Sequence, residues 1–324
     1  MHVGIIGGAS TIGSTLAYGL VCDDPRNSVT LFEADLDAAW GHATDLRHAN
    51  YHFSGAPLTG QDPRNRPGTV AHAPTDAIGE HDLDAVVITA RVAPSADDEA
   101  RSAEGARSRE LDANVPLIDA IARDLRSIEP VPTVVVTNPV DRIVYRLRSR
   151  LDWPRSTVLG FSLAETARVA DAIARRHDVH PTAVSCPTMG EHGEHVVPIF
   201  SRTTVEGESV SFARDEREAI VDEIRAVPFE IAGKRGLEDS SRWVSGAGLL
   251  RVLRTIASPE RTGPLCLSTV LDGEYGFDDG CLSVPVALTA DGVDEIVEWD
   301  LADAELERLQ AAHDVVWRDI QGFE

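Results

Sequence analysis

The chain has 324 residues, and its hydrophobic content of 43% suffices for two domains with buried cores. No apolar run approaches the roughly 18 to 20 residues of a membrane span, and the first residues resemble a strand, not a secretory signal, so we expect a cytoplasmic protein. With 53 acidic against 30 basic residues, the formal net charge is −23, which argues against nucleic acid or an anionic membrane as a partner.

Lysine is almost absent, because Lys234 is the single one and arginine supplies the other 29 basic residues. This composition is typical of proteins from a salt-rich cytoplasm, where a Debye length of about 3 Å at 1 M salt screens the self-repulsion of an acidic surface. An ordinary acidic protein is the alternative, but it leaves the lysine depletion unexplained. The four cysteines form no C-x-x-C pair and lack zinc-ligand spacing, so we expect reduced thiols and no metal site.

The first half of the chain alternates short apolar runs with helical stretches. We expect strands at Val3–Ile6, Val29–Glu33, Ala85–Thr89 and Thr133–Thr137, and helices at Ser14–Val21, Leu36–Ala49 and Leu111–Ser127. Continuous apolar strands separated by helices predict a parallel, doubly wound sheet of the α/β class.

The pattern of helices and strands in the second half of the chain predicts a mixed α+β domain. We expect helices at Ala164–Arg176, Arg214–Ala257 and Ala302–Ile320, with strands at Ala183–Pro187, Val196–Thr204, Glu208–Phe212, Leu265–Asp272 and Cys281–Leu288. We place the boundary near residue 150, which gives a dinucleotide-binding domain over residues 1–150 and a substrate domain over residues 151–324.

A glycine-rich turn joins the first strand to the first helix. Read as G-x-G-x-x-G, it has Gly8 and Gly13 in place and Ser10 at the middle position. Such a turn lets the backbone approach a pyrophosphate at the helix N-terminus, as in a Rossmann domain. Glu33 ends the next strand, where an acid hydrogen-bonds the ribose 2′-hydroxyl of NAD and repels the 2′-phosphate of NADP. A tight turn that binds nothing is the alternative.

A candidate catalytic group follows in the second half. His192 lies between two glycines in Gly190-Glu191-His192-Gly193, and histidine can take or give a proton near neutral pH. Glu165 and Arg168 share a helix face at i,i+3 spacing, so one could orient His192 while the other binds a substrate carboxylate. A surface ion pair is the alternative from spacing alone.

These residues belong to a set of segments that resembles the malate/lactate dehydrogenase family along essentially the whole chain. The matching segments are the glycine turn, Asp45–Ala49, the strand at residues 86–90, Asn138–Asp141, Gly160-Phe161, the G-E-H-G loop, Gly273–Gly276 and Ser283–Leu301. The resemblance implies a Rossmann domain with a substrate domain, NAD as cofactor, and a 2-hydroxy acid as substrate.

The resemblance also implies roles for single residues. His192 is then the proton acceptor, Glu165 orients it where the family has Asp, Arg168 binds the C1 carboxylate, and Asn138 lies at the reacting carbonyl. Arg107 would polarise the carbonyl, with Arg109 as the alternative, and Arg101 would bind the second carboxylate of malate. Ser245 would line the far wall of the pocket. The expected cofactor contacts are Gly8, Ser10, Thr11, Ile12, Gly13, Glu33, Thr89, Ala90, Asn114, Thr137 and Asn138.

Besides Glu165, three features depart from the family pattern: Ser10 in the glycine turn, Arg91 after Thr89-Ala90 where the family has glycine, and a longer stretch at residues 91–100. We expect a malate dehydrogenase of the tricarboxylic acid cycle that is a homodimer or homotetramer. A dehydrogenase for lactate or another 2-hydroxy acid, and a non-catalytic dinucleotide-binding homologue, are the alternatives.

Overall fold

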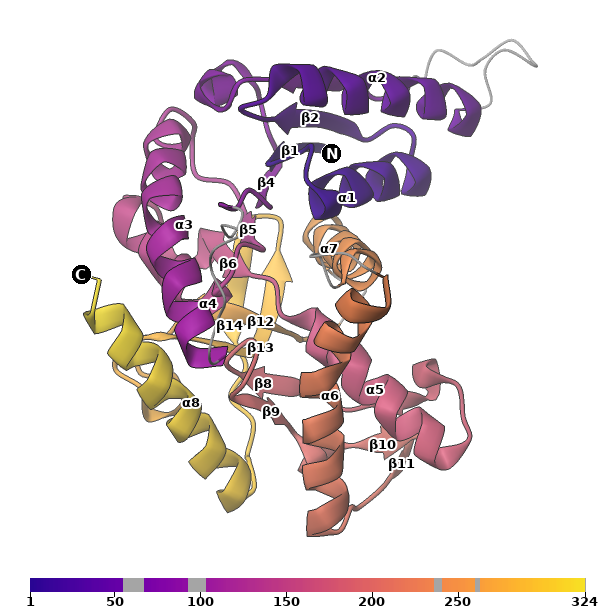
Figure 1. Ribbon diagram of the computed structural model, residues 1–324, viewed down its shortest axis with the longest axis vertical. Coiled ribbons are helices and arrows are strands. Elements are labelled where there is room, and N and C mark those ends of the chain that lie inside the picture. Colours follow the sequence, from indigo (N-terminus) through magenta and orange to yellow (C-terminus); the bar gives the residue numbers. More distant parts are fainter. Residues whose placement is uncertain (55–66, 93–102, 236–240, 260–262, 324) are drawn as a thin grey trace.

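The computed structural model describes residues 1–54, 67–92, 103–235, 241–259 and 263–323, with the backbone alone for residues 103–108. The predicted fold class is confirmed, because a parallel α/β half precedes a mixed α/β half (Figure 1). In the described part of the chain all four cysteines are free thiols, and three of them are buried.

Six parallel strands form the first half of the main sheet. They lie in the order β3-β2-β1-β4-β5-β6, which is the doubly wound order of a dinucleotide-binding domain. The strands are β1 (His2–Ile6), β2 (Ser28–Phe32), β3 (Val70–Ala73), β4 (Ala85–Ile88), β5 (Thr133–Val135) and β6 (Val158–Gly160). The helices that connect them are α1 (Thr11–Asp23), α2 (Leu36–Phe53), α3 (Ala103–Leu125) and α4 (Val140–Arg150).

The second half extends the same sheet with antiparallel strands. Beyond β6 the order continues β12-β13-β8-β9, and β14 pairs with β13. These strands are β8 (Thr188–Gly190), β9 (Val196–Pro198), β12 (Leu265–Val270), β13 (Cys281–Thr289) and β14 (Gly292–Ile296). A separate small sheet contains β7 (Val184–Ser185), β10 (Thr204–Val205) and β11 (Glu208–Ser209). The helices are α5 (Leu163–His177), α6 (Arg214–Arg235), α7 (Arg242–Ala257) and α8 (Asp303–Gln321).

Several short elements differ from the sequence-based expectation. The expected strand at Ala183–Pro187 is found only in part: Val184–Ser185 form β7 in the small sheet, and the separate strand β8 leads into the His192 loop. The expected strand at Val196–Thr204 divides into β9, a 3-10 turn and β10. The expected helix at Arg214–Ala257 is two helices, α6 and α7. Helix α4 and strands β3, β6, β8 and β14 were not predicted.

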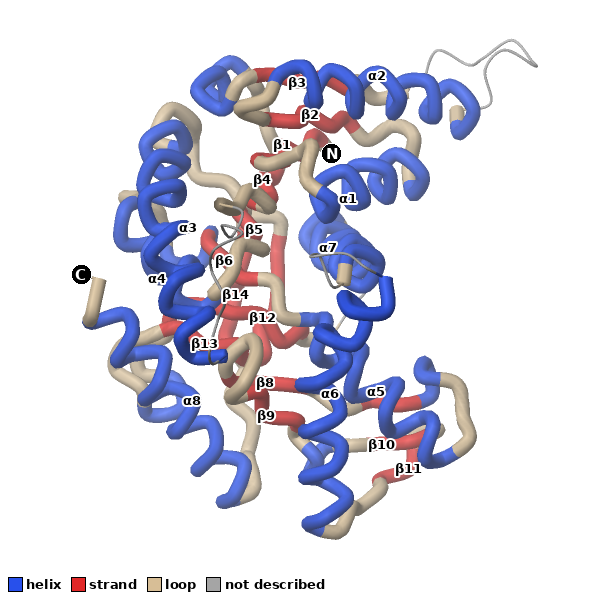
Figure 2. The backbone as a smooth tube through the Cα atoms, in the orientation of Figure 1, coloured by secondary structure: helices blue, strands red, loops and turns tan. Residues whose placement is uncertain are grey.

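The helices cover both faces of the sheet. Figure 2 shows the strands of the main sheet as a central band with α3, α4 and α8 on one side and α1, α7, α6 and α5 on the other. Strands β1 and β4 are neighbours whose connections leave in opposite directions, so a crevice opens at their carboxyl ends. The sheet therefore brings the ends of β1, β4, β5 and β6 to one place.

Candidate active site

A cavity of about 150 Å³ opens at the carboxyl ends of these strands. Its wall combines the first turn of α1, the residues after β4, β5 and β6, the His192 loop and the start of α7. Nine of the predicted site residues line it: Ser10, Thr11, Ile12, Thr89, Thr137, Asn138, Arg168, His192 and Ser245. The structure thus brings residues from the two halves of the chain to one cavity.

The buried Glu165 contacts both His192 and Arg168, the two predicted side chains that line this cavity. His192 Nδ1 lies 3.0 Å from Glu165 Oε2, and neither atom has another hydrogen-bond partner among the described residues. Arg168 Nη1 donates to the second carboxylate oxygen, Oε1, at 2.9 Å. The Glu165 side chain reaches both partners although it is one methylene longer than the family's Asp.

The charges of this group favour a protonated histidine. Burial lowers the pKa of His192, but the Glu165 carboxylate outweighs that effect and raises the pKa above the ordinary 6.5. Burial in the same way opposes the charge on Glu165, but His192 and Arg168 hold its pKa below the ordinary 4.5. Because Nδ1 faces Glu165, the other ring nitrogen, Nε2, is the one left for the cavity that His192 lines.

Two buried contacts fix the loop that carries His192. The backbone N–H of His192 donates to Asp141 Oδ2 at 2.9 Å, and Ser268 Oγ donates to the other oxygen of Asp141 at 2.6 Å. Burial of Asp141 raises the pKa of its carboxyl. Asp141 belongs to the T-N-P-V-D segment, but its role could not be predicted from the sequence, because no spacing rule connects it to a loop about 50 residues later in the chain.

A buried ion pair supports the same loop from α4. Arg142 donates to Glu191 Oε1, and both side chains are almost completely buried. The remaining guanidinium nitrogens, Nε and Nη2, donate to Asp319 Oδ2 on α8 at 3.0 and 2.7 Å. Glu191 Oε2 accepts the backbone N–H of His195 at 3.0 Å, so the carboxylate closes the loop around His192.

Sequence reasoning missed one side chain that positions the carboxylate-binding arginine. Arg168 Nη2 donates to Ser241 Oγ at 3.0 Å, and both residues line the cavity. Ser241 is the residue before α7, and its hydroxyl makes no capping hydrogen bond to that helix. A serine before an apolar helix is a typical N-cap. The sequence therefore indicates a polar role for Ser241, but it does not indicate that the hydroxyl accepts a hydrogen bond from Arg168.

The glycine turn is built differently from the sequence-based interpretation. Gly7, which was not singled out, makes the tight turn with φ +82°, and a Cβ there would lie 2.4 Å from the backbone N of Ala90. Gly8 instead packs against β2, because a Cβ would lie 2.7 Å from Leu31 Cβ. At Gly13 a Cβ would lie 2.5 Å from the carbonyl oxygen of Gly7, so the close approach of helix and turn requires glycine at this position.

Ser10 has a definite place in the turn. Its Oγ accepts the N–H of Gly13 at 3.0 Å, which makes it the N-cap of α1, and it lies 3.0 Å from Thr89 Oγ1. The N–H groups of the first helical turn have no partner within the helix. The cap satisfies that of Gly13 and leaves those of Thr11 and Ile12 to bind an anion. The turn therefore fits the pyrophosphate of a dinucleotide.

Glu33 is the residue directly after β2 and lies beside this turn. Its two carboxylate oxygens accept the backbone N–H groups of Ala9, at 3.2 Å, and Ala34, at 3.0 Å. These bonds hold the carboxylate at the edge of the crevice with lone pairs left to accept a ribose hydroxyl. The residues present fit NAD.

Asn114, an expected cofactor contact, joins two segments of the site through its side chain. It is fully buried, its Oδ1 accepts the N–H of Val92 at 2.8 Å, and its Nδ2 donates to the carbonyl of Asn138 at 2.9 Å. Asn114 thus joins the segment after β4 to the segment after β5. Thr137 Oγ1 makes a parallel link to the carbonyl of Ala90 at 2.7 Å.

The arginines expected on the mobile segment are only partly described. Arg101 lies outside the described residues, and Arg107 lies on α3 with its side chain outside them. Arg109 is exposed and does not line the cavity. Glu110, three residues after Arg107 on the helix, does line it.

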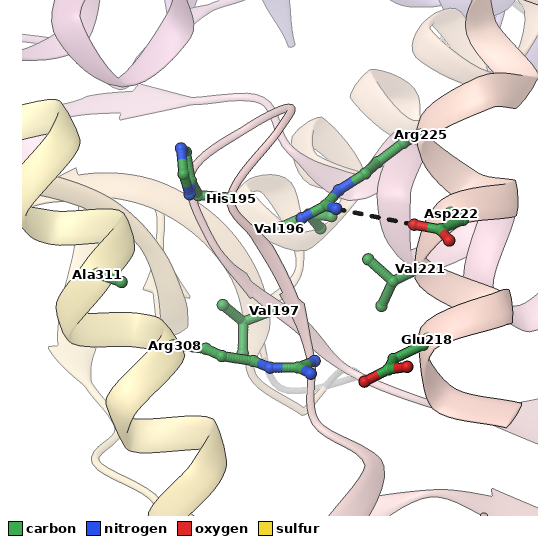
Figure 3. A pocket seen from close by; sticks show the side chains of 9 residues that line it. All are labelled: His195, Val196, Val197, Glu218, Val221, Asp222, Arg225, Arg308 and Ala311. Carbon is green, nitrogen blue, oxygen red and sulfur yellow. Dashed lines mark ion pairs between the residues drawn. The ribbon is translucent and has the colours of Figure 1, made fainter. Parts of the chain in front are cut away.

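A second cavity of about 380 Å³ lies between β9, α6 and α8 (Figure 3). Figure 3 shows that Arg308 extends toward the part of α6 that carries Glu218 and Asp222, and Arg225 Nη1 lies 4.0 Å from Asp222 Oδ1. The charges are mixed, and no predicted site residue lines this cavity. Within the described ranges, no three His, Cys, Asp or Glu side chains are grouped as a metal site would need, and no helix has the length and apolarity of a membrane span.

Comparison with known proteins agrees with this geometry. Residues 1–160 match the family model described as lactate/malate dehydrogenase, NAD binding domain, and residues 163–323 match its alpha/beta C-terminal domain. A malate dehydrogenase of Halobacterium salinarum is 30% identical over 97% of this chain and 99% of its own length. An L-lactate dehydrogenase of Salinibacter ruber is 28% identical over 95% of this chain and 93% of its own length.

A solved malate dehydrogenase from Salinibacter ruber superposes with a TM-score of 0.83 at 26% identity, over 99% of this chain and 97% of that one. The family models together span nearly the whole chain, and the relatives match it from end to end. The chain therefore belongs to the lactate/malate dehydrogenase family and is a malate-dehydrogenase-like, NAD-dependent 2-hydroxy-acid dehydrogenase.

Proposed function

We propose that this dehydrogenase interconverts malate and oxaloacetate, with His192 as the proton-transfer group. The observation that carries the proposal is that Glu165 contacts both His192 and Arg168, and that these two line one cavity at the carboxyl ends of the parallel strands. A base, the carboxylate that orients it, and a cation for the substrate carboxylate are the groups that oxidation of a 2-hydroxy acid requires.

Each residue has a definite task in the proposed reaction. Arg168 binds the C1 carboxylate, and Ser241 holds its guanidinium in place. His192, oriented by Glu165, takes the hydroxyl proton at Nε2 during oxidation and returns it to the carbonyl oxygen during reduction. NAD, when bound, supplies the hydride acceptor or donor for C2 of the substrate.

Two further residues complete the site. We assign Arg107 the stabilisation of charge on the reacting oxygen, and Asn138, which lines the cavity after β5, a contact with the same group. Arg107 is preferred over Arg109 because it lies one helical turn before Glu110, which lines the cavity, whereas Arg109 is exposed.

The choice of malate rests on a second cation for the second carboxylate. Arg101 is our candidate by resemblance, and malate dehydrogenases are frequent among the similar relatives. Lactate is the competing substrate, since a relative of similar identity is an L-lactate dehydrogenase. Ser245 leaves room in the wall without selecting between them.

The cofactor preference and the setting of the enzyme follow from charge. Glu33 at the edge of the crevice favours NAD over NADP, whose 2′-phosphate it would repel. We further propose that the enzyme acts in a salt-rich cytoplasm, in the tricarboxylic acid cycle, as a homodimer or homotetramer. The net charge of −23 with one lysine is the basis for the salt-rich setting.

Steady-state NADH oxidation in a potassium chloride series tests the proposal. We expect kcat/KM for oxaloacetate to exceed that for pyruvate at least roughly 100-fold, because a site built for a second carboxylate rejects an analogue that lacks it. NADPH should be a poor substitute for NADH. A preference for pyruvate would identify a lactate-type enzyme and overturn the assignment to malate.

A further inference from the structure

Arg242 is a cation in the candidate active site that the family resemblance does not explain. It is the first residue of α7 and lines the same cavity as Arg168 and His192. Ser245, one helical turn later, lines the cavity beside it. The start of α7 therefore brings a positive charge to the wall of the substrate cavity.

The charge of Arg242 is not neutralised within the described part of the chain. Its Nε is buried and has no hydrogen-bond partner there, and no described carboxylate forms an ion pair with it. The first turn of α7 holds no acidic residue, and this positive end of the helix dipole adds to the local potential. A buried guanidinium N–H without an acceptor is unfavourable, so a ligand oxygen at this place would stabilise it.

An aromatic ring holds Arg242 in place without removing its charge. The guanidinium carbon lies 4.2 Å from the centroid of the Trp243 ring, which is cation–π distance. By contrast, Arg168 shares its charge with Glu165 and donates to Ser241, the residue next to Arg242. Of the three arginines among the described residues that line the cavity, Arg91, Arg168 and Arg242, Arg168 is paired with Glu165, whereas Arg242 has no carboxylate partner among the described residues.

We propose that Arg242 binds the second anionic group of the substrate and so selects a dicarboxylic 2-hydroxy or 2-keto acid. The guanidinium groups of Arg168 and Arg242, which both line this small cavity, match a ligand with a carboxylate at each end. Arg168 takes the C1 carboxylate, and Arg242 takes the distal one. This inference rests on the proposed 2-hydroxy-acid dehydrogenase function and assigns its substrate specificity to a residue on α7, in addition to Arg101.

Kinetics of Arg242→Gln with two substrates test this role. With oxaloacetate, kcat/KM should fall roughly 10- to 100-fold, mainly through KM, because a charge-assisted contact to one carboxylate is lost. With pyruvate, kcat/KM should stay unchanged, since pyruvate has no distal carboxylate. Arg242→Lys keeps the charge without the planar fork and should give an intermediate value for oxaloacetate.

A matched control is available on the same helix. Arg251 is exposed on the opposite face of α7, so Arg251→Gln removes the same charge from the protein and should behave like wild type with both substrates. The affinity for NADH, measured by fluorescence quenching, should be equal in Arg242→Gln and wild type.

Three results would overturn the role of Arg242. An equal loss with both substrates would place it at the C1 carboxylate, a loss of NADH affinity would place it at the cofactor, and wild-type kinetics would remove it from the site. Failure of the wild type to reduce any 2-keto acid would instead overturn the proposed malate function, so the two failures are distinguishable.

Discussion

The buried pair of Arg142 and Glu191 gives the sharpest prediction about the support of the His192 loop. Arg142→Met removes the guanidinium that pairs with the Glu191 carboxylate, in a place where the Glu191 side chain is 0% exposed. Breaking a buried ion pair by removing one partner costs about 3–5 kcal/mol of unfolding free energy. With an unfolding entropy of about 2.1 cal/mol/K per residue, this corresponds to a fall in Tm of roughly 4–7 °C.

Thermal unfolding followed by circular dichroism measures this loss, and two variants serve as controls. Asp319→Asn removes the other partner of Arg142, but the Asp319 side chain is 44% exposed, so the cost should stay below about 1 kcal/mol. Arg142→Met/Glu191→Gln also removes the buried negative charge of Glu191 and should regain part of the stability lost in the single variant.

Salt dependence separates a buried pair from a surface pair. Because ions do not screen a pair that water cannot reach, the loss in Arg142→Met should be equal at low and multimolar potassium chloride. A loss below about 1 kcal/mol, or one that disappears at high salt, would refute the reasoning that the pair is buried and supports the loop.

Three further variants test other parts of the site. In wild type, the rate of 2-keto acid reduction should persist above pH 6.5 and fall as the pH rises through the raised pKa of His192. Glu165→Gln should shift this fall to lower pH and reduce kcat roughly 100-fold. A pH profile that does not shift would contradict the pairing of Glu165 with His192. Ser241→Ala removes one hydrogen bond to a charged group and should raise KM for the 2-keto acid roughly 10-fold at unchanged NADH affinity; an unchanged KM would exclude the positioning role. Gly7→Ala should raise the Kd for NADH at least roughly 10-fold in a titration, whereas Gly41→Ala, where a Cβ meets open space, should leave it unchanged; equal affinities in the two variants would contradict the tight turn.

The sequence predicted the parts of the fold and site that depend on local pattern. The apolar runs after Met1 and before Thr89 form buried parallel strands, and the i,i+3 spacing of Glu165 and Arg168 does place them in contact. The position of Glu33, after the strand that follows the glycine turn, also predicted its place beside that turn.

Contacts between distant segments could not be predicted in this way. Ser241 lies 73 residues from Arg168, and Arg142 lies 177 residues from Asp319, so only the folded sheet brings them together. Strands β6 and β8 have three residues each, which is too short for a period to be recognised. The choice of Gly8 instead of Gly7 shows that a glycine motif does not itself specify which glycine has positive φ.

The central claim is that His192 transfers a proton to and from a 2-keto acid while NAD exchanges the hydride. The direct test is NADH oxidation by oxaloacetate, compared between wild type and His192→Ala with NADH affinity measured in parallel. The account predicts a rate at least roughly 1000-fold lower in the variant at unchanged NADH affinity. A wild-type protein that binds NADH but reduces no 2-keto acid, or a His192→Ala variant that keeps the wild-type rate, would contradict it.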